Sequence, residues 1–537
     1  MDTLELWGGP ECTVNRVGDH FRDQLRETGH HDRLPDLDLF AELGISALRY
    51  PVLWERVSPH RPDSFDWSWS DARLARICEL GMRPIAGLVH HGSGPAYTNL
   101  LADNFAPGLA QFAGAVAARY PWIEDWTPVN EPVTTARFSA LYGLWYPHHC
   151  DERSFWLALL NQIDGVRLAM TAVRAVNPAA RLIQTDDLGR TYATAAMGDQ
   201  AAFDNVRRWM SWDLLCGRVV PGHPLWRRLC TYGFEPRLRS IAEAPCPPDV
   251  IGVNHYLTSD RFLDHRIQRY PAHLRGGNGA KTFADTEAVR VLDPPPPGLR
   301  GVLREAWARY GIPLAVTEVH NGCTREEQMR WVADAWQTAR ELRAEGIEIG
   351  AVTSWAMFGN RGWNTLLTAS GEYEPGVFDV SGGMPHPTAL AALLKTLVAQ
   401  QETHPAARGA GWWRRKSRLL HPSVARPAPM RDRHIPRVER FTPSLLLAGK
   451  DLDELATVCR HRGLAYRLAD PADEAGATAV LAEGPWAVIA SGDAYGLLVG
   501  DCAERGITIV DGSSCKSADA LLDKMIDCDA CAQPMAA

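Results

Sequence analysis

Short apolar runs, rich in β-branched and aromatic residues, recur along the first 357 residues. Most span six to eight residues, and several end at Gly, Pro or a polar cluster, a pattern that predicts strands rather than buried helices. The eight runs cover residues 4–9, 47–54, 83–90, 125–131, 181–187, 249–256, 313–319 and 350–357. Stretches with helical periodicity separate them, at residues 36–44, 106–120 and 326–346, and the last ends at Gly346, a typical helix stop.

Eight strands alternating with helices over the first 400 residues predict an α/β fold, a (β/α)8 TIM barrel with long loop insertions. A doubly wound sheet is the competing interpretation. It explains less well why polar residues cluster at the carboxyl end of nearly every predicted strand, as an active site at one end of a barrel requires.

The pattern changes after residue 400. Residues 401–442 are rich in Arg and Pro without helical periodicity, which predicts a linker. Its segment Trp412–Lys416 is expected to dock on a neighbouring surface or to be solvated, rather than to bind a membrane. Residues 443–537 again alternate between strand and helix patterns, and predict a second, smaller Rossmann-like α/β domain.

Composition narrows the class of protein. The chain has 46% apolar and 22% charged residues and a net charge of −8, so nucleic acid is not an expected partner. No run of 18 apolar residues predicts a membrane span, and the first residues lack a secretory pattern. The 12 cysteines are scattered, as expected for reduced thiols in the cytoplasm, and the close pair Cys528 and Cys531 is interpreted as incidental. No metal site is predicted.

Two glutamates stand where glycosidic chemistry needs them. Hydrolysis of a glycosidic bond requires one carboxyl to protonate the leaving oxygen and a second carboxylate to attack or to activate water. Glu131 and Glu318 each close a predicted strand, and Asn130 beside the first can bind a sugar hydroxyl. Either glutamate alone is equally well explained as a helix N-cap neighbour, but the two at matching strand ends favour catalysis. The 19 Trp residues suit a site that stacks sugar rings.

Six motifs in this part of the chain resemble those of glycoside hydrolase family 1, the β-glucosidase-like family. They occur in the family's order, at Arg49–Val57, His90–His91, Thr127–Pro132, Val253–Thr258, Val316–Gly322 and Trp355–Trp363. The resemblance implies a retaining glycosidase with Glu131 as acid/base and Glu318 as nucleophile. It also implies that Arg49 keeps the nucleophile ionised and that Tyr256 donates its phenol proton to it. The other implied substrate-site residues are His90, Asn130, Asn254, Trp355 and Trp363. Taken singly, such residues are more often structural.

The sequence departs from the family at the expected sugar-binding end. The family's first-strand Gln is replaced by Asn15, and a Glu that grips the outer hydroxyls of glucose is replaced by Gly362, preceded by Arg361. We expect a cavity beside Arg361. If its guanidinium faces the site, an acidic or otherwise modified sugar is favoured, and if it points outward, the gap holds water. Glucose as substrate does not follow.

Residues 443–537 resemble the start of dTDP-4-dehydrorhamnose reductase and related sugar-nucleotide reductases. The glycine-rich phosphate turn of such folds is missing, because Gly449 is followed by Lys450 and Asp451. We therefore expect a truncated unit without a cofactor, used for packing or assembly, and the fusion suggests bacterial sugar or polysaccharide metabolism.

Three functions compete. A retaining β-glycosidase, hydrolase or transglycosidase, accounts for both carboxylates. A carbohydrate-binding or regulatory barrel that has lost turnover accounts for the altered sugar-binding end. A nucleotide-sugar oxidoreductase is opposed by the missing glycines. The sugar, the linkage and the oligomeric state are not predicted.

Overall fold

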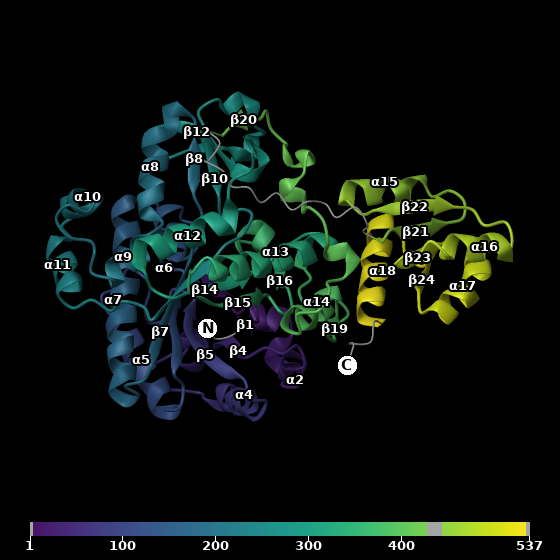
Figure 1. Ribbon diagram of the computed structural model, residues 1–537. Coiled ribbons are helices and arrows are strands. Elements are labelled where there is room, and N and C mark those ends of the chain that lie inside the picture. The colour runs from purple at the N-terminus through teal and green to yellow at the C-terminus, as the bar shows by residue number, and fades with distance from the viewer. Residues whose placement is uncertain (1–3, 427–442, 533–537) are drawn as a thin grey trace.

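The computed structural model describes residues 4–426 and 443–532, and its largest part is a closed barrel of eight parallel strands (Figure 1). All eight predicted strands are present. Around the barrel they are β1 (Glu5–Gly9), β4 (Ala47–Pro51), β5 (Arg83–His90), β6 (Asp125–Asn130), β7 (Arg181–Asp187), β9 (Val250–Asn254), β14 (Leu314–Val319) and β15 (Ile349–Trp355). The prediction of a TIM barrel is confirmed, and the doubly wound alternative for this part of the chain is wrong.

The barrel interior is packed and is not a pore. One buried layer is contributed by six of the strands and consists of Trp7, Ala47, Ile85, Ile183, Ala315 and Ala351. The layer mixes large and small side chains, because the space inside an eight-stranded barrel is only wide enough for side chains to fill it. The layer closes the bottom of the barrel, so the polar residues at the carboxyl ends of the strands face a pocket with a solid floor.

Long helices surround the barrel. The principal ones are α2 (Asp36–Ala41), α4 (Ser68–Glu79), α5 (Phe105–Arg119), α7 (Glu152–Val176), α12 (Gly298–Tyr310), α13 (Arg325–Ala344) and α14 (Ala389–Val398). The three helices predicted from periodicity correspond to α2, α5 and α13. Helix α13 stops where expected, since Gly346, two residues beyond its end, has a φ of +92° that favours glycine.

The insertions lie at the carboxyl end of the barrel. A hairpin of β2 (Val14–Val17) and β3 (His20–Asp23) follows the first strand. A four-stranded sheet is formed by β8 (Thr191–Ala193), β10 (Arg261–Asp264), β11 (Arg275–Gly277) and β12 (Thr282–Glu287). Short helices complete the loops: α1 (Gln24–Glu27), α3 (Trp54–Val57), α6 (Pro132–Ala136), α8 (Gly198–Arg207), α9 (Met210–Leu215), α10 (Trp226–Thr231) and α11 (Glu235–Glu243).

The segment after α14 follows the surface of the barrel. The side chain of Trp413 is buried, Arg414 pairs with Asp334 at 2.6 Å, and Arg415 pairs with Glu327 of α13. Thus Trp412–Lys416 docks on the barrel, one of the two outcomes expected for it. The rest of the predicted linker, residues 427–442, lies outside the described residues.

A second unit follows, with four parallel strands in the order β22-β21-β23-β24 (Figure 1). Its elements are β21 (Leu445–Ala448), α15 (Asp453–Arg462), β22 (Tyr466–Ala469), α16 (Glu474–Leu481), β23 (Ala487–Ala490), α17 (Asp493–Arg505), β24 (Thr508–Asp511) and α18 (Ala518–Ala532). Cys528 and Cys531 are both free thiols and lie on α18.

Helix α18 lies between this sheet and the barrel, where it packs against α13, α14 and α15 (Figure 1). The junction contains buried charges: Arg462 of α15 donates to Glu326 of α13, and His404 bonds to Asp529 of α18 at 2.9 Å. Among the described residues, no helix is long and apolar enough to cross a membrane.

Candidate active site

Three barrel strands end in a residue with left-handed backbone. His91 after β5, Glu131 after β6 and Ala356 after β15 have φ of 56°, 47° and 50°. Such a conformation costs a residue other than glycine on the order of 1–3 kcal/mol and persists only where the surroundings enforce it. Clustering of three such residues at one end of the barrel marks this end as the site, in agreement with the position of active sites in this fold.

Glu318 is held at the end of β14 by a cation and a phenol. Arg49 Nη1 donates to its Oε1 at 2.8 Å, and Tyr256 donates its hydroxyl proton to the other carboxylate oxygen. Burial raises the pKa of Glu318, while Arg49 and the Tyr256 hydrogen bond oppose this shift. Both groups stabilise the ionised carboxylate, the form that a nucleophile needs. This placement matches the roles expected for Arg49 and Tyr256.

Glu131 has a different environment. Its side chain is 4% exposed and accepts a 2.6 Å hydrogen bond from Asn254 Nδ2. Burial raises the pKa of Glu131 well above its ordinary value, and the charge of Glu318 raises it further. No arginine or lysine among the described residues forms an ion pair with Glu131, whereas Glu318 has Arg49. Burial and the charge of Glu318 thus favour the protonated form of Glu131, whereas Arg49 and Tyr256 favour the ionised form of Glu318. Retaining hydrolysis requires such a difference between an acid and a nucleophile.

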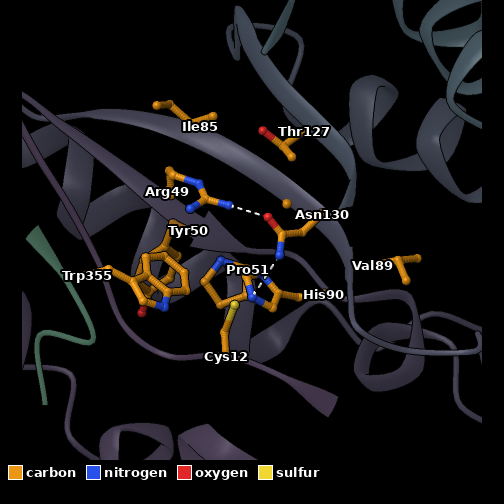
Figure 2. A pocket seen from close by; sticks show the side chains of 11 residues that line it. Cys12, Arg49, Tyr50, Pro51, Ile85, Val89, His90, Thr127, Asn130 and Trp355 are labelled. Carbon is orange, nitrogen blue, oxygen red and sulfur yellow. Dashed lines mark hydrogen bonds between the residues drawn. The ribbon is translucent and has the colours of Figure 1, made fainter. Parts of the chain in front are cut away.

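Asn130 lies at the centre of the hydrogen-bond network of the site, between Arg49 and His90 (Figure 2). Its Oδ1 accepts from Arg49 Nη2 and from Thr185 Oγ1, both at 2.7 Å, and its Nδ2 lies 3.2 Å from His90 Nε2. Asn254 approaches the same oxygen at 3.5 Å. Asn130 thus positions Arg49 in addition to the sugar-binding role expected for it.

His90 and Trp355 form the aromatic wall of the site (Figure 2). Their rings stack at 5.3 Å with planes 8° apart, and the Arg49 guanidinium lies 4.6 Å from the centre of the Trp355 ring. Burial lowers the pKa of His90 well below its ordinary value, so the ring is neutral. A small pocket lies beside these residues, with Cys12 also in its lining. The sequence-predicted residues from six strand ends therefore meet in one place.

The cavity expected beside Gly362 is absent, and this prediction is wrong. A Cβ at Gly362 would stand 2.7 Å from Arg22 Nη1, so the Arg22 guanidinium fills the space. Arg22 is itself neutralised by Glu27, with hydrogen bonds of 3.0 and 2.7 Å. Gly362 also has a φ of +88°, which a Glu side chain would strain.

Arg361 and Asn15 lie on different sides of this loop. The Arg361 side chain is exposed, and its guanidinium lies 5.6 Å from the centre of the Tyr373 ring, where β16 (Asn360–Arg361) pairs with β17 (Tyr373–Glu374). No contact between Arg361 and either catalytic glutamate is found among the described residues. Asn15 is fully buried and donates to the Leu367 carbonyl at 3.3 Å, while its own Oδ1 has no partner.

Two residues of the site were not predicted from the sequence. His91 Nε2 lies 3.9 Å from Glu131 Oε2, and burial lowers the pKa of His91 to about 3, so this neighbour is neutral. Glu11, two residues after β1, accepts hydrogen bonds from the indole nitrogens of Trp355 and Trp363 at 3.3 and 3.2 Å. The position of Glu11 just beyond the first predicted strand, where active-site residues of a barrel lie, could have identified it from the sequence.

Fold and site together describe a (β/α)8 barrel with two buried glutamates at the carboxyl end of its strands. No protein-family profile matches the chain. Solved structures with this fold include a family 1 β-glucosidase from Thermotoga maritima, with a TM-score of 0.58 and 15% identity over 75% of this chain and 99% of that one. A GH1 β-glucosidase from Exiguobacterium antarcticum superposes with a TM-score of 0.59 and 17% identity, over 74% of this chain and 97% of that chain.

Curated proteins with similar sequences have glycosidase names. A phospho-cellobiase from Klebsiella oxytoca is 23% identical over 378 residues, 64% of this chain and 78% of its own. An aryl-phospho-β-D-glucosidase from Bacillus subtilis is 23% identical and covers 61% of this chain and 75% of its own. A rice β-glucosidase is 24% identical, covering 61% of this chain and 73% of its own. None of these three relatives matches more than 64% of this chain.

Proposed function

We propose that the barrel is a retaining β-glycosidase that hydrolyses or transfers a β-linked glycosyl residue through a covalent glycosyl-enzyme. The observation that carries the proposal is the pair of buried glutamates at the ends of β6 and β14, one without a cation and one paired with Arg49. The glycosidase names of the sequence relatives support it. A carbohydrate is then the substrate, and the described residues provide the chemistry without a cofactor.

The two steps use the glutamates in turn. Glu318 Oε attacks the anomeric carbon while Glu131 transfers its proton to the leaving oxygen, and the C–O bond to the aglycone breaks. Glu131, now ionised, takes a proton from the incoming water or alcohol, which displaces Glu318 from the anomeric carbon. Arg49 and Tyr256 stabilise Glu318 each time it leaves as a carboxylate.

Replacing the nucleophile tests the proposal. Glu318→Gly should abolish turnover of an aryl β-glycoside, and azide should restore it with an α-glycosyl azide as product, because azide fits the space left by the carboxylate. Glu131→Ala should instead spare substrates with good leaving groups, which need little protonation. Full activity of Glu318→Gly, or equal losses on good and poor leaving groups for Glu131→Ala, would refute the assignment.

A carbohydrate-binding barrel without turnover is the second candidate, favoured by the filled position at Gly362 and by the low exposure of both glutamates. A panel of aryl β-glycosides separates the two, since a binding protein gives saturable binding without release of the aryl group.

We assign the barrel to residues 1–400, the linker to 401–442 and a truncated Rossmann-like unit to 443–537. The role proposed for that unit is packing against α13 and α14, in a cytoplasmic bacterial protein.

A further inference from the structure

Glu11 is a buried acidic group in the site that the two catalytic steps do not use. Its side chain is 4% exposed. One carboxylate oxygen accepts from the Thr13 backbone at 2.9 Å and from the Thr13 hydroxyl at 2.6 Å, and the other accepts from the indoles of Trp355 and Trp363. A buried carboxylate is costly unless its surroundings hold it, and here four neutral donors do so without a cation.

A short chain of contacts links Glu11 to the nucleophile. Trp355, which donates to Glu11, lies under the Arg49 guanidinium, and Arg49 pairs with Glu318. The negative charge of Glu11 is close enough to contribute to the raised pKa of Glu318 and of Tyr256. Glu11 is therefore connected to the nucleophile through Trp355 and Arg49, two residues that line the small pocket of the site.

The surroundings of Glu11 offer acceptors and little free positive charge. Asn15, further along the same loop, has a buried Oδ1 without a hydrogen-bond partner. The two buried arginines of this region are both neutralised, Arg49 by Glu318 and Arg22 by Glu27. Sugar hydroxyls, which donate hydrogen bonds, fit such a surface. A phosphate group carries about −1.5 to −2 charges at neutral pH and would meet carboxylates without a free cation to pair with.

We propose that Glu11 is a specificity-determining residue of the sugar pocket, which selects a neutral or amine-bearing glycone and rejects a phosphorylated one. This rests on the proposed glycosidase function. The proposed preference for an unphosphorylated sugar distinguishes this chain from the phospho-glycosidases among its sequence relatives, whose names state a phosphorylated substrate.

The test compares three aryl β-glucosides that differ only at C6: the neutral sugar, its 6-amino-6-deoxy analogue and its 6-phosphate. The wild type should turn over the neutral and amino sugars with a kcat/KM at least 100-fold above that of the phosphate. Glu11→Gln should narrow the gap between neutral and phosphorylated sugars by about 10-fold or more and remove any advantage of the amino sugar. The matched control is Glu55→Gln, which replaces another buried carboxyl group at this end of the barrel that contacts neither indole.

Calorimetry on the wild type gives a second readout, the binding of S-linked neutral and 6-phosphorylated glucosides. This measurement needs neither turnover nor a folded variant. Tighter binding or faster turnover of the phosphorylated sugar would overturn the inference while leaving the glycosidase proposal intact. Equal effects of Glu11→Gln and Glu55→Gln would also overturn it. Absence of turnover of all three glucosides and of the wider panel of aryl β-glycosides refutes the glycosidase function, and the binding preference then decides the role of Glu11.

Discussion

At the scale of single residues, identical side chains acquire different chemistry from their neighbours. Glu131 and Glu318 are equally buried, yet only Glu318 has a guanidinium and a phenol directed at its carboxylate. Burial alone raises the pKa of a carboxyl group, and a cation or a donated hydrogen bond lowers it. The proposed difference between acid and nucleophile therefore depends on Arg49 and Tyr256, contributed by β4 and by the loop after β9.

Tyr256→Phe tests this division through pH dependence. The Tyr256 hydrogen bond lowers the pKa of Glu318, so its removal should raise that pKa and move the acidic limb of the kcat/KM profile to higher pH. Loss of a hydrogen bond to a charged group, worth about 1.5–3 kcal/mol, should reduce kcat/KM by on the order of 10- to 100-fold. The basic limb, which reports Glu131, should stay in place.

The matched control is Tyr270→Phe, which removes a tyrosine hydroxyl bonded to Asp264 at 3.0 Å outside the barrel. It should leave the acidic limb unchanged. An acidic limb that does not move in Tyr256→Phe would show that the phenol does not set the ionisation of Glu318.

At the scale of elements, the contact between the barrel and the C-terminal sheet depends on buried ion pairs. Arg462, at the end of α15, forms a bidentate contact with the fully buried Glu326 near the start of α13, and also reaches Asp523 of α18 at 2.6 Å. Arg330 of α13 donates in turn to the carbonyl oxygens of Arg462 and Gly463. One arginine thus holds three helices from two units of the chain.

Arg462→Ala should destabilise this junction strongly, because it leaves Glu326 buried without its cation. Breaking a buried pair in this way costs about 3–5 kcal/mol, which should lower the thermal unfolding midpoint measured at a fixed scan rate. Arg239→Ala is the control, since its pair with Glu235 is exposed and should contribute about 0–1 kcal/mol.

The double variant Arg462→Met and Glu326→Leu should recover most of the lost stability, because two apolar side chains leave no buried charge without a partner. If Arg462→Ala melts no earlier than Arg239→Ala, the pair does not hold the junction.

At the scale of the whole molecule, the chain combines a barrel that carries the proposed catalytic pair with a four-stranded sheet unit in which Gly449 is followed by Lys450 and Asp451. A Cβ at Gly449 would lie 2.6 Å from the Ser491 carbonyl oxygen, so neighbouring backbone closes the end of β21. Asp451 and Asp453 then stand at the start of α15, where a pyrophosphate would need positive charge. Packing of α18 on α13 and α14 makes this unit part of the barrel's surface.

We predict that the full-length protein does not bind NAD(H) or NADP(H). Two acids at a helix N-terminus repel the pyrophosphate that other sheets of this kind hold there. Titration followed by nicotinamide fluorescence for the reduced forms, and by calorimetry for the oxidised forms, should show no saturation below roughly 100 μM, about −5.5 kcal/mol. Saturable binding of either nucleotide below that concentration would return the oxidoreductase hypothesis to consideration.

The sequence by itself determined the elements and the chemical class. Apolar runs of strand length, separated by periodic helices, specify a barrel because each run must be buried on both faces. Glu131 and Glu318 were predicted because catalytic groups in such a barrel stand where strands end. These inferences are local, since each depends on residues adjacent in the chain.

Only the tertiary structure decided what fills the space between strand ends. Arg22 occupies the position beside Gly362 although 340 residues separate them, and Glu11 meets Trp355 and Trp363 from the opposite end of the barrel sequence. Closing the barrel brings β1 beside β15, and with it side chains whose proximity no local pattern encodes. Strand ends are therefore predictable from the sequence, whereas the shape and charge of the sugar pocket arise from contacts between residues distant in the chain.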